Sequence, residues 1–215
     1  MIVKICGITN EEDAVLAEEL GGDIIGFIAH AKSKRLIDIE KIGEITDVLS
    51  SKTALVMENP NEEILDKAAN INADFIQLHG NESPELCHKL KEMGFETIKT
   101  VHVPVKATDI NGMLIYCSLY ECSFLLLDTK IGRISGGTGI RHDWNLSKKI
   151  IEEVKKPVFL SGGLNPENVK KAIQITKPYG VDVSSGVESE IGRKDPNLLY
   201  EFIKNSKEGF YGIKS

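Results

Sequence analysis

Eight short apolar runs, separated by longer segments with helical spacing, constrain the fold of this chain more than any other feature. Most runs are apolar on both faces, which is typical of parallel strands covered by helices on two sides. The predicted strands span residues 2–8, 23–28, 53–57, 75–79, 97–102, 124–128, 157–161 and 181–184. Eight such units leave about 27 residues each, which predicts an α/β protein with a single-domain (β/α)8 TIM barrel over residues 1–215.

A doubly wound open sheet is the alternative architecture for this alternation of elements. That fold usually places its phosphate-binding loop after the first strand, whereas the glycine-rich loops here follow the last two predicted strands. Their position favours the barrel. Capping residues followed by proline predict helix starts at Ser83-Pro84, Asn165-Pro166 and Asp195-Pro196.

The overall charge excludes some classes of partner. At a net charge of −6 the chain does not have the concentrated basic surface that binding to nucleic acid requires. No apolar run is long enough to span a bilayer, and residues 1–4 enter a strand at once, unlike a signal peptide. We therefore expect a cytoplasmic location with no membrane partner. Free thiols fit this location, and Cys117 and Cys122 have no zinc-finger spacing that would favour a metal site.

The first predicted strand ends in a cysteine. Barrel active sites form at the C-terminal ends of the strands, and Cys6 stands at such an end, beside Gly7. Lys4 shares its face of the strand, because side chains alternate, and a nearby ammonium lowers the pKa of a thiol. Cys6 is therefore a candidate general base. A buried cysteine that packs as a small apolar residue is an equally good interpretation.

The sixth predicted strand ends in a lone carboxylate, Asp128, after four apolar residues. Loss of solvation at the rim of an apolar strand raises the pKa of an acid and lets it donate a proton near neutral pH. We favour this role for Asp128 over the alternative, in which it caps the following loop.

The last two predicted strands are followed by small residues suited to a phosphate. Gly162 and Gly163 follow the seventh strand, and Ser185 and Gly186 follow the eighth. Backbone N–H groups in these two loops form the phosphate site of many barrels. The alternative is that both loops are only tight turns.

Three further features are less specific. Arg35, in a basic loop, is suited to clamp a carboxylate with its planar fork, although a solvated loop explains it equally well. The segment 129–143 contains four glycines and predicts a lid over the site. His79 is favoured as a structural histidine, and the other histidines share no spacing that would predict a metal cluster.

Taken together, the strand ends resemble the phosphoribosylanthranilate isomerase family of tryptophan biosynthesis. The matching motifs are Lys-Ile-Cys-Gly-Ile-Thr (4–9), Gly-Phe with a following Ser-x-Arg (26–35), Gln-Leu-His-Gly (77–80), Leu-Leu-Asp-Thr (126–129), Gly-Gly-Thr-Gly (136–139), Asp-Trp (143–144), Leu-Ser-Gly-Gly-Leu-Asn-Pro-Glu-Asn-Val (160–169) and Val-Asp-Val-Ser-Ser-Gly-Val-Glu (181–188). The chain departs from the family at Ala29, where an aromatic residue is usual, and at Lys34, where proline is usual.

The resemblance implies a reaction and a role for each candidate. It implies that N-(5-phosphoribosyl)anthranilate undergoes an Amadori rearrangement with Asp128 as general acid and Cys6 as general base, without metal or organic cofactor. It places the substrate phosphate on the two small-residue loops and its carboxylate on Arg35, with Asp182 in a supporting role. It leaves open whether the chain is a monomer or a homodimer.

Two other kinds of function compete with this one. Another phosphosugar barrel enzyme, such as indole-glycerol-phosphate synthase or ribulose-phosphate epimerase, would need more lysines or metal-binding histidines at the strand ends than this sequence shows. A non-catalytic sensor of a phosphate ligand would need only the phosphate loops. The presence of both Cys6 and Asp128 argues against the sensor.

Overall fold

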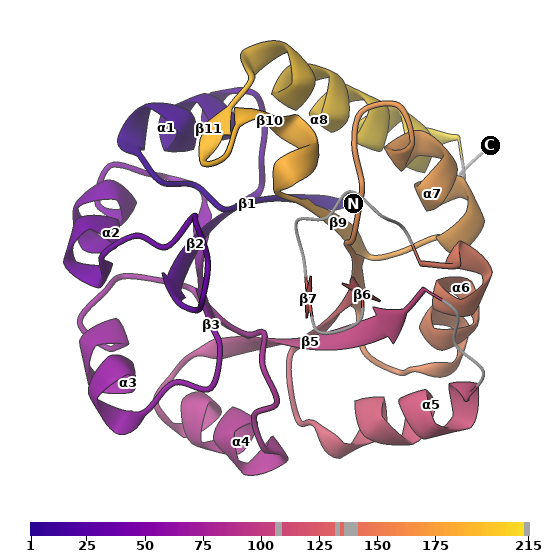
Figure 1. Cartoon of the computed structure of the whole chain (residues 1–215), viewed down its shortest axis with the longest axis horizontal. Coiled ribbons are helices and arrows are strands. Elements are labelled where there is room, and N and C mark those ends of the chain that lie inside the picture. The colour runs from indigo at the N-terminus through magenta and orange to yellow at the C-terminus, as the bar shows by residue number, and fades with distance from the viewer. Residues whose placement is uncertain (106–108, 132–133, 136–141, 213–215) are drawn as a thin grey trace.

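A closed barrel of eight parallel strands forms the centre of the molecule, surrounded by helices (Figure 1). The computed structural model describes residues 1–105, 109–131, 134–135 and 142–212. The barrel strands are β1 (Ile2–Cys6), β2 (Ile24–His30), β3 (Lys52–Met57), β4 (Phe75–Leu78), β5 (Glu96–Pro104), β6 (Phe124–Ile131), β8 (Val158–Leu160) and β9 (Gly180–Val183). The predicted barrel is confirmed.

Helices alternate with these strands and cover the outside of the barrel. They are α1 (Glu11–Glu19), α2 (Ile39–Thr46), α3 (Glu62–Ala68), α4 (Pro84–Glu92), α5 (Ile110–Leu119), α6 (Trp144–Glu153), α7 (Val169–Thr176) and α8 (Pro196–Tyr211). In the described part of the chain, no helix is both long and apolar enough to cross a membrane.

The barrel closes because its first strand pairs with its last, and because the consecutive strands β5 and β6 pair on the other side. The first strand, β1, pairs with β2 on one side and with β9 on the other, so that Lys4 lies opposite Asp182. On the far side of the barrel β5 pairs with β6, and His102 lies opposite Asp128. These registers bring residues from both ends of the sequence to one rim.

The barrel interior changes from apolar to polar along the strands. Alternate residues point inward. At the N-terminal end of the strands they form an apolar cluster of Ile24, Ala54, Phe75, Ile98, Leu126 and Phe159. Towards the C-terminal end the inward side chains are polar: Lys4 and Asp182 are joined by an ion pair of 2.7 Å, and Gln77 and Thr100 are buried. Polar chemistry is thus confined to one end of the barrel.

Three short strands and one helix boundary differ from the sequence expectation. Strand β7 (Ile134–Ser135) pairs with β6, and β10 (Glu188–Glu190) pairs with β11 (Arg193–Lys194), after a single 3-10 turn, η1 (Ser185–Val187). Helix α7 begins at Val169 rather than beside Pro166. The reason is that Asn165 and Asn168 each accept the backbone N–H of the other, which holds this segment in a turn.

Candidate active site

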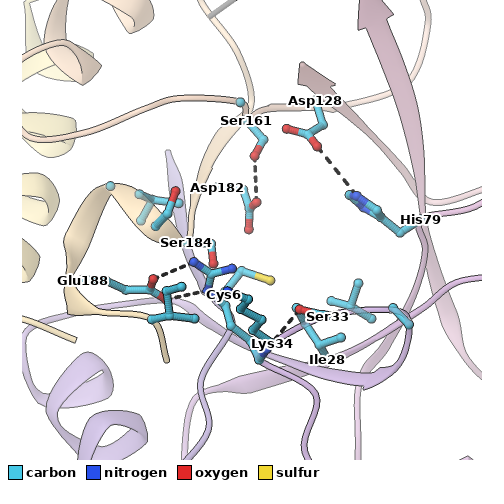
Figure 2. A pocket seen from close by; sticks show the side chains of 18 of the residues that line it. Cys6, Ile28, Ser33, Lys34, His79, Asp128, Ser161, Asp182, Ser184 and Glu188 are labelled. Atoms are coloured by element: carbon cyan, nitrogen blue, oxygen red, sulfur yellow. Dashed lines mark hydrogen bonds and ion pairs between the residues drawn. The ribbon is translucent and has the colours of Figure 1, made fainter. Parts of the chain in front are cut away.

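A cavity of about 660 Å³ opens at the C-terminal ends of the strands. It is lined by all eight residues that the sequence singled out as site residues, namely Cys6, Arg35, Asp128, Gly162, Gly163, Asp182, Ser185 and Gly186. Figure 2 shows several of them with their side chains directed at a common space. The strand ends therefore form one site, as barrel geometry requires.

Cys6 is buried at the end of β1 beside a buried ammonium. A Cβ atom added to Gly26 would lie 3.0 Å from Lys4 Nζ and 3.1 Å from Cys6 Sγ, so both groups flank this glycine. Burial favours the neutral amine, but Asp182 and Cys6 raise the pKa of Lys4 above its ordinary value, so it stays charged.

Lys4 lowers the pKa of the Cys6 thiol, as expected from the sequence, but it does not determine the direction of the net shift. Burial raises the pKa of the Cys6 thiol above its ordinary value, and the nearby Lys4 ammonium offsets only part of this. Asp182, which also accepts a hydrogen bond of 2.9 Å from Ser161 Oγ, adds a further increase. The thiol form of Cys6 is therefore favoured at neutral pH.

Asp128 is buried at the barrel rim, as predicted. Its side chain comes from β6, and burial raises its pKa to about 7. The negative charge of Asp182 acts in the same direction, while the backbone N–H of Thr129 opposes it. An acid with this pKa is half protonated at neutral pH and can donate a proton there.

Two histidines from neighbouring strands lie against Asp128. His79 Nε2 is 3.7 Å from Asp128 Oδ2 (Figure 2), and the rings of His79 and His102 meet edge to face. Burial lowers the pKa of His79 to about 4, so the ring is neutral at pH 7. Ligand atoms of His79, His102 and Asp128 lie within 4.8 Å of one another, a grouping that could hold a metal ion. Sequence spacing gave no sign of this group, because its members belong to three strands.

The two small-residue loops meet at one side of the cavity. Gly162 has φ +85°, and a Cβ there would lie 2.2 Å from Thr129 Oγ1. A Cβ on Gly186 would lie 1.9 Å from the carbonyl oxygen of Leu164, so the loop after β9 packs directly on the loop after β8. Asn168 Nδ2 donates to Gly163 O at 2.9 Å and fixes the loop after β8. The loops are more than independent tight turns.

Arg35 is held by a carboxylate of the protein itself, whereas Lys32 and Lys34 in the same loop are exposed, as the alternative of a solvated loop predicted for this segment. Arg35 Nε and Nη2 donate to the two oxygens of Glu188, each at 2.7 Å. Lys194 donates to the same carboxylate at 3.1 Å. Neither partner is predicted as a site residue from the sequence. Glu188 ends one of the quoted motifs, but Lys194 lies in a charged stretch that looks solvated.

The predicted lid cannot be placed in the same way. Residues 132–133 and 136–141, which contain the four glycines of segment 129–143, lie outside the described residues. Two residues that flank them are described. Thr129 and His142 are both buried, and Thr129 Oγ1 is 2.8 Å from His142 Nδ1.

Comparison with known proteins agrees with this site. A family model described as N-(5'phosphoribosyl)anthranilate (PRA) isomerase matches residues 3–205. The N-(5'-phosphoribosyl)anthranilate isomerase of Aquifex aeolicus is 44% identical over 213 residues, which cover 95% of this chain and 98% of that one.

Solved structures give the same result. The phosphoribosyl anthranilate isomerase of Thermotoga maritima superposes with a TM-score of 0.86 at 42% identity, covering 97% of this chain and 100% of that one. A phosphoribosyl anthranilate isomerase in complex with reduced 1-(o-carboxyphenylamino)-1-deoxyribulose 5-phosphate superposes with a TM-score of 0.82 at 40% identity, with coverage of 97% and 100%. The chain belongs to the phosphoribosylanthranilate isomerase family.

Proposed function

We propose that Asp128 is the general acid and Cys6 the general base in the isomerisation that this enzyme family performs. The family converts N-(5'-phosphoribosyl)anthranilate to 1-(2-carboxyphenylamino)-1-deoxyribulose 5-phosphate in tryptophan biosynthesis. The observation that carries the assignment is the position of the two groups: one buried acid with a pKa of about 7 and one buried thiol beside an ammonium line the same cavity.

The first step needs a proton donor. Protonated Asp128 gives its proton to the furanose ring oxygen of the substrate, the bond from C1 to that oxygen breaks, and C1 becomes an iminium carbon. Burial keeps a large share of Asp128 protonated at neutral pH, which supports this role. The neutral ring of His79 beside it adds no positive charge that would promote early ionisation of the acid.

The second step needs a proton acceptor. The thiolate of Cys6 removes the proton from C2, the electron pair forms the C1–C2 double bond, and the iminium nitrogen becomes neutral. The resulting enolamine tautomerises to the ketone. Because the pKa of Cys6 lies above that of Asp128, the reactive form with thiolate and protonated acid is a minor one. Lys4 stabilises the thiolate in it.

The remaining site residues are proposed to hold the substrate. The two packed loops line the cavity with Gly162, Gly163, Ser185 and Gly186. Backbone N–H groups of these residues would donate hydrogen bonds to the substrate phosphate. Arg35 would bind the anthranilate carboxylate. A relative of known structure binds an analogue with these same two anionic groups, which supports the assignment. Asp182 holds Lys4 in place.

We also propose the cellular location, the class of ligand and the oligomeric state. The biosynthetic role of the family supports the cytoplasmic location expected from the sequence. A net charge of −6 supports a small phosphosugar ligand rather than nucleic acid. The chain is a monomer or a homodimer, and sedimentation of the purified protein over a range of concentrations distinguishes the two.

The test uses the fluorescence of anthranilate after the substrate is generated in the cuvette. Wild-type protein should turn the substrate over, whereas Cys6→Ala and Asp128→Ala should each lower kcat by at least about 10²-fold, the usual effect of losing one general acid or base. Cys87→Ala is a matched control, since Cys87 is a buried cysteine of α4 that does not line the cavity.

Three outcomes would contradict the proposal. Activity above about a tenth of wild type in either variant would remove that residue from the mechanism. An equal loss in Cys87→Ala would show a general effect of cysteine removal. Stabilisation of the wild type by inorganic phosphate without any turnover would favour a non-catalytic sensor.

A further inference from the structure

Lys194 joins three parts of the site from a fully buried position. Its Nζ donates to the carbonyl oxygens of Cys6 at 2.8 Å and Ser184 at 3.1 Å, and to Glu188 Oε1 at 3.1 Å. Burial lowers the pKa of Lys194 from its ordinary value, but three acceptors match the three N–H groups of an ammonium, so the geometry favours the charged form. The ends of β1 and β9 are thus tied to the β10–β11 hairpin next to the proposed base.

Arg35 reaches the same hairpin across the end of β1. Gly7 has φ +72°, and a Cβ atom there would lie 2.7 Å from Arg35 Cδ. The Arg35 side chain can therefore cross at this point only because residue 7 has no side chain. Glu188 then accepts one N–H from Nε and one from Nη2. The other three of the five guanidinium N–H groups, two on Nη1 and one on Nη2, do not contact Glu188 and form the free edge of the guanidinium.

The three side chains have a net charge of one positive unit. Burial favours the neutral acid, but Arg35 and Lys194 hold the pKa of Glu188 below its ordinary value, so it is a carboxylate between two cations. Without Lys194, the positive charge of Arg35 and the negative charge of Glu188 would sum to zero. The second cation therefore leaves a positive charge at a side chain that lines the cavity.

We propose that Lys194 and Glu188 are positioning residues that hold the free edge of the Arg35 guanidinium towards the cavity and so select substrates with a carboxylate. Glu188 fixes the orientation of the fork, and Lys194 fixes Glu188 and supplies the excess charge. This inference rests on the proposed binding of the substrate carboxylate by Arg35. It adds the two residues whose contacts with Arg35 make that binding selective.

The test compares two ligands that differ only in the carboxylate. They are reduced 1-(o-carboxyphenylamino)-1-deoxyribulose 5-phosphate and the same compound with an unsubstituted phenyl ring, and their dissociation constants are measured by titration calorimetry. Wild-type protein should prefer the carboxylated ligand. Lys194→Met should reduce this preference by at least about tenfold, because a charge-assisted contact is lost, while the affinity for the unsubstituted ligand changes little.

Arg193→Met is the matched control. Arg193 precedes Lys194 in the same strand, but its side chain is half exposed and its ion pair is with Glu12 on the surface. It should leave the preference unchanged. Glu188→Gln is the second variant, because it keeps the size of the side chain if Lys194→Met does not fold. It should also reduce the preference, because an amide offers only one oxygen to Arg35 in place of two, and the loss of the fixed orientation outweighs the removal of one negative charge.

The outcomes separate this inference from the function on which it rests. Failure of both ligands to bind the wild type, without turnover, would reject the proposed function itself. A wild type that prefers the carboxylated ligand, together with folded Lys194→Met and Glu188→Gln that keep the full preference, would overturn the positioning role alone. An equal loss of both ligands in these variants would also overturn it, because it would show a structural effect.

Discussion

Two buried lysine–carboxylate pairs in this molecule have almost the same geometry and different surroundings. Lys4 Nζ is 2.7 Å from Asp182 inside the barrel. Lys99 Nζ is 2.6 Å from Glu82 on the outside of the barrel wall. Both lysine side chains are 0% exposed, so burial does not distinguish the pairs.

Their neighbours do distinguish them. Lys99 also donates to Gly80 O at 2.8 Å and lies over the ring of Tyr120, while Glu82 accepts backbone N–H groups from Asn59 and Gly80. This pair therefore fastens one loop to the barrel wall. Lys4, in contrast, lies beside the Cys6 thiol, and its partner Asp182 lines the cavity. A buried ion pair becomes a functional candidate only through such a reactive neighbour.

The largest effect on stability is expected outside the cavity. Lys99→Met should lower the free energy of unfolding by about 3–5 kcal/mol, because it leaves the carboxylate of Glu82 buried without its cation. The kcat of the folded fraction should stay within about twofold of wild type. Urea unfolding and steady-state kinetics measure the two quantities.

A double variant checks the cause of that effect. Lys99→Met with Glu82→Gln removes both charges but keeps an oxygen for the backbone N–H groups, so it should recover at least about half of the lost stability. A large fall in kcat with unchanged stability in Lys99→Met would contradict the distinction between the two pairs.

The next effect concerns Asp128, whose burial should cost stability. In the unfolded chain its pKa is near 3.8, and in the fold it is about 7. Between these values the folded form binds the extra proton, so its contribution to stability falls as pH rises and is lost above about pH 7. Asp128→Asn should therefore gain stability over wild type, by up to about 4 kcal/mol at pH 8.

Thermal or urea unfolding of both proteins between pH 4 and pH 8 tests this. The difference between the two proteins isolates Asp128, because His79 and His142, whose pKa values are lowered to about 4, titrate in both. A difference that does not grow with pH would show that the buried carboxyl is not the cause.

The smallest of these effects concerns the pKa of the Cys6 thiol. Lys4→Met removes the ammonium that favours the Cys6 thiolate, so the pKa of the thiol should rise by about one to two units and kcat should fall by about 10- to 10²-fold. The pH dependence of Cys6 alkylation by iodoacetamide reports the pKa directly. Combining Lys4→Met with Asp182→Asn avoids an unpaired carboxylate, but it also removes a charge that raises the pKa of the thiol, so its reference is Asp182→Asn alone. An unchanged alkylation profile in Lys4→Met relative to wild type, or in the double variant relative to Asp182→Asn, would remove Lys4 from this role.

Local sequence signals predicted the strands and the residues at their tips. Apolar runs that end in Cys6 or Asp128 are visible without a structure, because strand and tip are contiguous. The raised pKa of Asp128 followed from its apolar strand. The direction of the pKa shift of Cys6 could not be predicted in this way, because burial and the charge of Lys4 act in opposite directions. Which effect is larger depends on how deeply the fold buries the thiol.

Contacts between segments that are distant in the sequence could not be predicted from local sequence patterns. Arg35 and Glu188 are 153 residues apart, and the hairpin that brings them together is rich in charged residues and short of apolar ones. His79, His102 and Asp128 come together only through the register of three adjacent strands. Periodicity describes each element alone, whereas these groupings depend on how the elements pair.

The pairing of β1 with β9 has a consequence for synthesis of the chain. The first strand is synthesised well before its neighbour on one side, residues 180–183, because about 175 residues separate the two strands in the chain. Until then one edge of the growing sheet has no partner and the proposed base has no cavity around it. A ribosome-bound chain that stops before residue 180 should therefore be inactive and open to aggregation, however well its first strands are formed.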